Sequence, residues 1–251
     1  MSKKLNLLQK DKGIHWIFWM AASFFAATAA TLGIVYLLRP FLLGVDDTVL
    51  NTIFGAVIYI LLLLIAIGIP VLVKKYDRTK LLKLLGLDEK PRWRDLGRAV
   101  LTFLAYYGIL FAVIIAIQLI FSIFGADGFQ DIMSQEQEIG FDKTGNDVGQ
   151  LVLIFLSLVI IPPLCEEIVM RGFLFGKLSK SMQFWPAAIL TSLVFAIAHW
   201  QLNVGIDTFV LSMVLCYVRV RNGSIWSGIF VHMMKNGLAF VLLFTNWVSF
   251  Y

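Results

Sequence analysis

Charged residues are scarce in this sequence. Asp, Glu, Lys and Arg make up 15% of its 251 residues and apolar residues make up 59%, whereas an average soluble domain has about 25% charged residues. The apolar residues occur in long runs, and the mean hydropathy is +0.84. This composition disfavours a soluble domain with a tail and predicts a polytopic membrane protein.

Cysteine is also nearly absent from the sequence. Cys165 and Cys216 lie far apart, within or beside apolar segments. No disulfide framework is therefore expected, and both are interpreted as small buried hydrophobes.

The net charge is +5, but the basic residues fall mainly in short segments between apolar runs. That placement is typical of membrane orientation, so no nucleic-acid binding is expected.

Seven apolar runs predict an all-α fold, a polytopic transmembrane helix bundle of about seven spans (six to eight), since one span takes about 20 residues. The runs cover residues 14–38, 50–73, 99–124, 148–161, 184–200, 206–218 and 225–247. The first run has full span length and no small-residue cleavage site, which favours a retained span over a signal peptide. A helix over residues 148–180 would be about 50 Å long, so Pro162-Pro163 is expected to kink or break it.

The distribution of Lys and Arg predicts the orientation of the chain. Basic residues mark the N-terminal arm, residues 74–98 and the turns near residues 177–180 and 219–221, whereas the alternate connections carry Asp46, Asp47, an acidic stretch over 127–147, and Asp207. We therefore expect a cytoplasmic N-terminus and an outer C-terminus. A chain of this size without an organellar signal points to a bacterial plasma membrane.

Two units are expected along the chain. Residues 1–147 would hold three transmembrane helices, an inner amphipathic segment and an outer acidic loop, and residues 148–251 would form a second helix bundle. The segment "KLLKLLGLDEKPRWRDLGR" (80–98) mixes leucines with basic residues. It is expected to lie along the inner interface, with an ordinary cytoplasmic loop as the alternative.

Three charges interrupt an apolar stretch, "PPLCEEIVMRGFLFG", at residues 162–176. In a helix, Glu167 and Arg171 are four residues apart and share a face, which predicts an ion pair. Glu166 is then left over, although a charge at the bilayer centre costs roughly 2.5–3.5 kcal/mol on translocon scales. Ionisable residues at such depth are candidates for a functional site.

Two of the three histidines fall in the late apolar segments. "FAIAH" places Phe195 and His199 four apart, and "HMMKN" does the same for His232 and Asn236. Glu166 and His199 are 33 positions apart with a basic turn about halfway, so an antiparallel helical hairpin would bring them to equal depth. We expect these groups to converge, with Lys235 on another face, reaching toward the interface.

Three motifs occur in order over residues 148 to 245: EExxxR as "EEIVMR", FxxxH as "FAIAH" and HxxxN as "HMMKN". Together with "RGFLFGKL", they resemble the CPBP family of intramembrane proteases, which includes the type II CAAX prenyl endopeptidases and the bacterial Abi, or bacteriocin-immunity, proteins. The resemblance implies that residues 148–251 form the catalytic helix bundle of an intramembrane endopeptidase, which acts on a membrane-associated peptide or protein. It implies Glu166 as the general base with His199 sharing its work, His232 and Asn236 as oxyanion donors, and Glu167 and Arg171 as groups that orient and neutralise the glutamate helix.

Several alternatives stay open. Glu166, His199 and His232 could hold one zinc ion with an open position for water, but the chain has no HExxH pattern, and a metal-free water activated by glutamate is slightly favoured. The same buried charges could serve an ion-coupled transporter, or the protein could be a catalytically silent immunity or regulatory partner. Membrane lipid is an expected partner in every case, and prenylated CAAX peptides, bacteriocin leaders and pheromone leaders are the candidate substrates.

Overall fold

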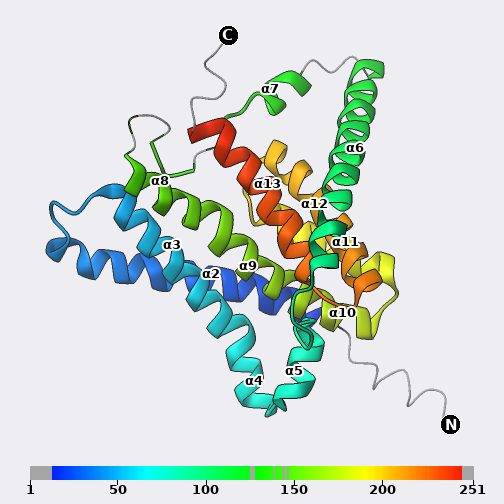
Figure 1. The fold of residues 1–251 in the computed structure, drawn as a ribbon, viewed down its shortest axis with the longest axis horizontal. Helices are drawn as coiled ribbons and strands as arrows, with labels where there is room; N and C mark the ends of the chain where they lie inside the picture. Colours follow the sequence, from blue (N-terminus) through cyan, green and yellow to red (C-terminus); the bar gives the residue numbers. More distant parts are fainter. Residues whose placement is uncertain (1–12, 125–127, 138, 143–144, 146, 245–251) are drawn as a thin grey trace.

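The computed structural model describes residues 13–124, 128–137, 139–142, 145 and 147–244 (Figure 1). Within these ranges the chain forms helices, turns and loops and contains no strand, so the all-α prediction is confirmed. The basic N-terminal arm, Asp127, Glu138 and the predicted end of the last span beyond Phe244 lie outside the described residues.

Among the described residues, six helical segments are long and apolar enough to cross a membrane, and a shorter apolar helix accompanies them. About seven spans were expected, so this multi-pass architecture confirms the prediction. The six are His15–Phe41 (α2, His15–Leu38, with η1, Arg39–Phe41), Asp47–Lys74 (α3, Asp47–Leu63; η2, Leu64–Gly68; α4, Ile69–Lys74), Trp93–Ile123 (α6), Val148–Ser181, Leu202–Asn222 (α12) and Trp226–Phe244 (α13). The short helix is α11, Phe184–Ile197, with 14 residues.

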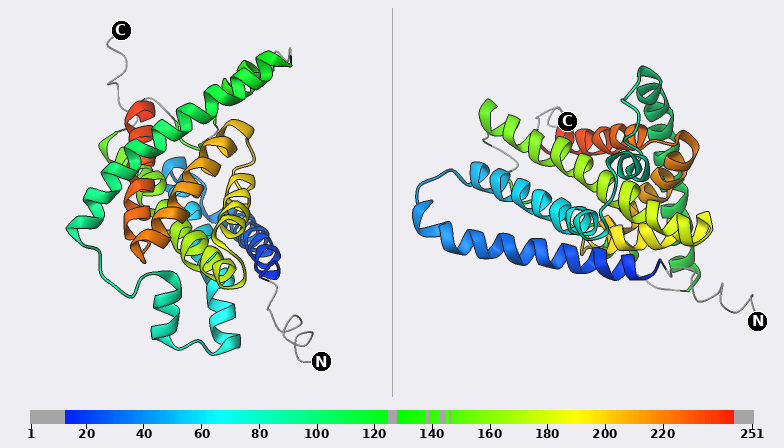
Figure 2. Two further views of the ribbon diagram at one scale, coloured as in Figure 1. Left: turned by 90° about the vertical axis from the view of Figure 1, so that its right-hand side faces the viewer. Right: turned by 90° about the horizontal axis from the view of Figure 1, so that it is seen from below.

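The segment Val148–Ser181 runs through the middle of the bundle, with α3 on one side and α13 on the other (Figure 2). It consists of α8 (Val148–Phe155), η3 (Leu156–Ile160), α9 (Ile161–Glu167), η4 (Ile168–Leu174) and α10 (Phe175–Ser181). Val169, Met170, Phe173 and Leu174 in η4 have no exposed surface. The charged motif therefore lies in the most deeply packed helix.

Of the kink or break expected at Pro162-Pro163, the break does not occur: the helical segment Val148–Ser181 continues through the prolines for 34 residues. A proline ring clashes with the carbonyl four residues earlier in a regular α-helix. Here the wide π-turn η3 ends directly before α9, in whose first turn both prolines stand. The π-turn η2 ends in the same way just before Pro70. The wider turn makes room for the proline ring without ending the helix.

The segment 80–98 is shared between two helices and the loop that joins them. Its first residues belong to α5 (Arg78–Leu85), and from Trp93 onward the chain is already in α6. Leu84 and Leu85 are buried against Gly172 and Gly176, where an added Cβ would lie 3.0 Å from the Leu85 carbonyl oxygen and 2.9 Å from that of Leu84. The two glycines of "RGFLFG" thus allow α5 to pack directly on the central helix.

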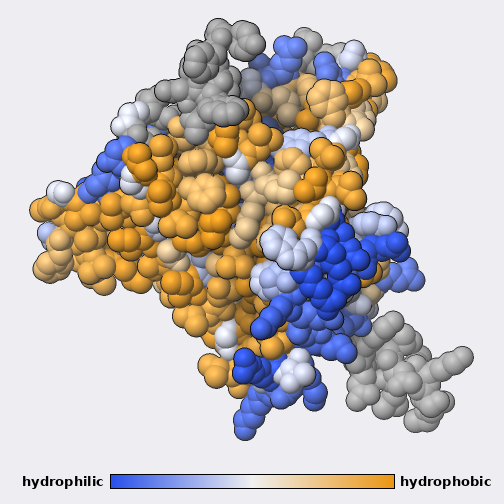
Figure 3. All heavy atoms as spheres, in the orientation of Figure 1, coloured by the Kyte–Doolittle hydropathy of each residue, from blue (hydrophilic) through white to orange (hydrophobic). Residues whose placement is uncertain are grey.

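The surface of the bundle is mostly apolar over α2, α3, α8 and α13, whereas hydrophilic side chains gather over α5 and the beginning of α6 (Figure 3). α7 (Phe129–Met133) lies at the opposite end of the molecule, beyond the end of α6 (Figure 1). Both cysteines are free and buried, as predicted. The apolar belt and its hydrophilic end are what a helical membrane protein requires.

Candidate functional site

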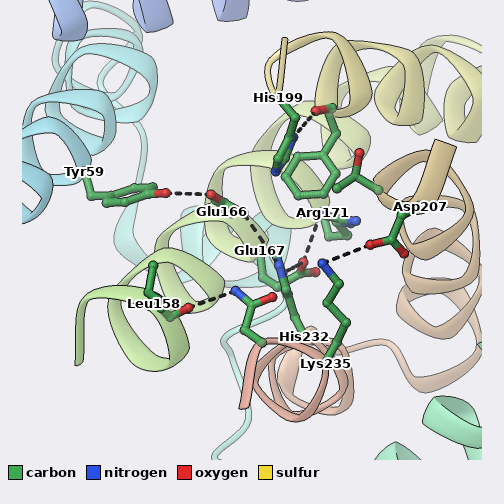
Figure 4. A network of polar contacts seen from close by, with 12 residues as sticks. Tyr59, Leu158, Glu166, Glu167, Arg171, His199, Asp207, His232 and Lys235 are labelled. Atoms are coloured by element: carbon green, nitrogen blue, oxygen red, sulfur yellow. Dashed lines mark hydrogen bonds and ion pairs between the residues drawn. The ribbon is translucent and has the colours of Figure 1, made fainter. Parts of the chain in front are cut away.

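A cavity of about 500 Å³ opens between α3, the central helix, α12 and α13. Glu166, His199, His232 and Asn236 all line it, although they come from three separate parts of the chain (Figure 4). Glu167 and Arg171 lie directly behind this wall and have no exposed surface. The packing of the helices therefore brings the six motif residues together, as expected from the sequence.

The predicted ion pair holds the buried layer behind the cavity together. Arg171 Nη1 lies 2.8 Å from Glu167 Oε1, and the guanidinium stacks over the Phe195 ring, 4.5 Å from its centroid. His232 Nδ1 donates to the same Glu167 oxygen at 3.1 Å. Because buried charges persist only when they are paired and hydrogen-bonded, Glu167 acts as the common partner of Arg171 and His232.

Glu166 is the carboxylate that reaches the cavity, with 8% of its surface exposed. Its Oε1 accepts a hydrogen bond from the Tyr59 hydroxyl at 2.7 Å, and its Oε2 lies 3.7 Å from His232 Nε2. Glu166, the glutamate of the motif that does not pair with Arg171, is thus contacted from two sides, by Tyr59 of α3 and by His232 of α13.

Tyr59 was missed by reasoning from the sequence. It lies in the second apolar run and belongs to no motif. The only signal is its hydroxyl, because a tyrosine buried in a span needs a hydrogen-bond partner. Only the packing of α3 on α9 identifies that partner as Glu166.

The FxxxH motif suggested that His199 lies in a helix, but the structure places it outside one. α11 ends at Ile197, and His199 stands in the turn that follows. Its Nδ1 bonds the Phe195 carbonyl oxygen at 2.8 Å, and since a carbonyl only accepts, Nδ1 carries the hydrogen. The other ring nitrogen, Nε2, therefore remains free to face the cavity.

Phe195 sets the spacing of the two imidazoles. Its ring is edge-on to His199, with centroids 4.8 Å apart, and to His232, with centroids 5.9 Å apart. The same side chain is 1% exposed and carries the Arg171 guanidinium on its face. The phenylalanine of FxxxH thus contacts three of the site's polar groups.

Asn236 has a partner that its motif did not suggest. Its Nδ2 donates to the Leu158 carbonyl oxygen at 2.8 Å. In an α-helix that carbonyl would accept from the N–H of residue 162, and in a π-turn from that of residue 163. Both residues are prolines without an N–H. Asn236 therefore caps the carbonyl that Pro162-Pro163 leaves open and ties α13 to the central helix.

This capping role predicts a rescue. Asn236→Ala leaves the Leu158 carbonyl unsatisfied and is expected to cost about 1–3 kcal/mol of unfolding free energy. Pro162→Ala restores an N–H beneath that carbonyl, so the double variant should lose less stability than Asn236→Ala alone. Thermal unfolding in detergent measures the effect, and Pro186→Ala in α11 is the matched control. An equal loss with and without Pro162→Ala would contradict the capping role.

Lys235 and Asp207 are placed differently from expectation. Asp207 does not belong to a connection but to the second turn of α12, because that helix begins at Leu202. Lys235 does not extend to the interface: its Nζ lies 3.0 Å from Asp207 Oδ2, and it lines the cavity. The Tyr106 hydroxyl of α6 also donates to Asp207. Pairing offsets the cost of holding both charges inside the bundle.

The candidate zinc ligands are not gathered into a ligand set. Among the residues that the structure describes, no three His, Cys, Asp or Glu side chains lie close enough together to hold a metal ion. His232 approaches Glu166, whereas the hydrogen bond of His199 is to Phe195.

The fold and this site together define a multi-pass helical membrane protein with a polar, carboxylate-bearing cavity inside its bundle. Residues 148–238 match the family model of the type II CAAX prenyl endopeptidases, Rce1-like. The matched segment contains all three motifs, in agreement with the resemblance that they suggested.

Two curated relatives match part of the chain. One is the "Putative membrane peptidase YdiL" of Bacillus subtilis (strain 168), 30% identical over 97 residues, which are 38% of this chain and 40% of that protein. The other is an "Uncharacterized 24.3 kDa protein" of Escherichia coli, also 30% identical over 97 residues, which are 37% of this chain and 43% of that protein. The match thus spans less than half of each relative. No solved structure matches this chain.

Proposed function

We propose that this protein is an intramembrane endopeptidase that hydrolyses a peptide bond of a membrane-associated peptide or protein. The observation that carries the proposal is the placement of Glu166 on the cavity wall, between the Tyr59 hydroxyl and His232 Nε2. The match of residues 148–238 to the Rce1-like family model supports the same class of reaction.

In this mechanism a water molecule in the cavity is activated by Glu166. Glu166 takes a proton from the water, and the water oxygen bonds to the carbonyl carbon of the substrate, whose oxygen becomes negatively charged. Collapse of this intermediate breaks the C–N bond, and the proton passes from Glu166 to the leaving amine. General acid–base work of this kind contributes about 10²–10⁴ in rate. His199 can share it, because its Nε2 is free to accept a proton.

The oxyanion would be stabilised from the α13 side of the cavity. Asn236 uses one amide hydrogen on the Leu158 carbonyl and has a second one to offer. His232 is held by Glu167, to which its Nδ1–H donates; its Nε2 is then a donor to the oxyanion in the imidazolium form, which carries a hydrogen on both ring nitrogens. One such donor is worth about 2.7–4 kcal/mol in characterised proteases. Glu167 and Arg171 hold His232 in place without contacting the substrate.

Tyr59 is proposed as a positioning residue for Glu166. Tyr59→Phe removes one hydrogen bond to a charged group, worth about 1.5–3 kcal/mol, and keeps the ring that packs on α9. We expect kcat to fall by about 10- to 100-fold with little change in KM, as measured by initial rates in detergent. Tyr36→Phe, at an exposed position on α2, is the control. A larger change in KM than in kcat would assign Tyr59 to substrate binding instead.

The experiment that tests the function is cleavage of a peptide library by the purified protein in detergent, together with analysis of its metal content. The library contains prenylated and unprenylated peptides with apolar anchors, so the cut sites reveal the substrate. Cleavage at defined bonds is expected. If no peptide is cleaved while liposomes show a proton or ion flux that depends on Glu166, the transporter alternative replaces the protease.

A further inference from the structure

The helices that line the cavity do so mainly from one half of their length, with Glu166 and His232 just past the midpoints of their helices. α3 contributes within residues 51–59, the central helix within 157–166, α12 within 204–208, and α13 within 232–243. Lys and Arg gather at the opposite ends of these helices: in the connection at residues 75–92, at Lys180 before the turn at 182–183, and at Arg219 and Arg221 before the turn at 223–225. The cavity therefore extends from Glu166 away from the basic end of the bundle.

The route from Glu166 toward the basic end is closed. The next two turns of the central helix hold Val169, Met170, Phe173 and Leu174, none of which has exposed surface. The Glu167–Arg171 pair lies in the same layer and is fully buried. This layer forms a floor beneath the Glu166 carboxylate, so a peptide cannot reach it from that side without unpacking the core.

The mouth of the cavity is crossed by a strap, defined as residues 135–137 and 139–141. Gln137, Ile139, Gly140 and Phe141 of the strap line the cavity. Three side-chain amides hold its backbone carbonyls: Asn51 donates to Gly140 at 2.6 Å, Gln201 to Glu136 at 3.0 Å and Asn203 to Gln135 at 2.7 Å. The strap belongs to the acidic connection between α6 and α8, at the end of the bundle opposite the basic connections.

We propose that the peptide reaches Glu166 from this strap-covered end, which the excess of Lys and Arg at the other end places on the outer face of the membrane. The inference rests on the proposed function and narrows its substrate class to peptide segments that emerge at the outer leaflet, such as the external juxtamembrane part of an anchored or exported peptide. Substrate enters at the strap, and the bond cleaved lies just inside the membrane from the outer side.

Two cysteine variants test the entry side. Gln137→Cys places a thiol on the exposed strap at the mouth, and Lys180→Cys places one at the basic end, also at an exposed position. The native cysteines are buried, and the unmodified protein controls for their labelling. With a membrane-impermeant maleimide, Gln137→Cys should be labelled in right-side-out vesicles and Lys180→Cys in inverted ones. Labelling of Gln137→Cys should abolish cleavage, whereas labelling of Lys180→Cys should leave it intact.

An impermeant substrate peptide then separates the entry side from the reaction itself. The peptide should be cleaved by right-side-out vesicles and spared by sealed inverted vesicles. Cleavage in detergent and in inverted vesicles only, or strap labelling from the inverted side only, would overturn the outer entry while leaving the protease intact. If detergent-solubilised protein cleaves nothing, the proposed function itself fails.

Discussion

Replacing Glu166 with glutamine is expected to lower kcat for peptide cleavage by about 10²–10⁴-fold while the protein stays folded. The amide keeps the shape of the side chain and can still accept the hydrogen bond that Tyr59 donates to Glu166 Oε1. It cannot take a proton from water, so the loss falls on the chemical step. Initial rates with a membrane-delivered peptide in detergent measure the effect, and thermal unfolding confirms that the fold is intact.

The matched control is Glu89→Gln, which neutralises an exposed carboxylate at the basic end of the bundle. Its cleavage rate should equal that of the unmodified protein. Retention of the full rate in Glu166→Gln would show that another group activates the water. Under the alternative of a silent immunity or regulatory partner, Glu166→Gln would also preserve the protein's biological effect.

Removing the charge of Arg171 is expected to have the largest effect on stability. Arg171→Met leaves Glu167 as a fully buried carboxylate without its cation, and breaking a buried pair in this way costs about 3–5 kcal/mol. The free energy of unfolding in detergent measures the loss. Lys180→Met removes an exposed cation from the same helix segment and should change it little.

A second variant keeps this prediction testable if Arg171→Met does not accumulate. Glu167→Gln/Arg171→Met removes both charges, and the glutamine can still accept from His232 Nδ1, which donates to Glu167 here. The double variant should therefore be more stable than Arg171→Met alone. If Arg171→Met unfolds like the unmodified protein, the Glu167–Arg171 pair is not what holds this layer together.

Much of the helical architecture could be predicted from local patterns. The first two apolar runs match the observed segments to within a few residues at each end, because about 20 apolar residues in a row leave a membrane helix as the only way to satisfy the backbone. The ion pair between Glu167 and Arg171 was predicted for a similar reason, since residues four apart on a helix are neighbours. The errors fall where helices begin and end, as at His199 and Asp207.

The details of the candidate site depend on contacts between helices, which local spacing does not encode. Tyr59 lies 107 positions from the glutamate that it contacts, and Asn236 lies 78 positions from the Leu158 carbonyl that it caps. Neither contact follows from a motif. The proline pair shows the same limit: alone it predicts a break, but with a π-turn before it and Asn236 across from it the helix continues.

The sequence by itself determined that this chain is a multi-pass helical membrane protein, that it carries the EExxxR, FxxxH and HxxxN motifs in order, and that Glu167 pairs with Arg171. These are properties of neighbouring residues and of hydropathy summed over a span. Only the tertiary structure decided which glutamate reaches the cavity, what holds it there and toward which end the cavity opens. Those outcomes depend on how separate helices are rotated and shifted against one another, and that is settled by side-chain packing across the whole bundle.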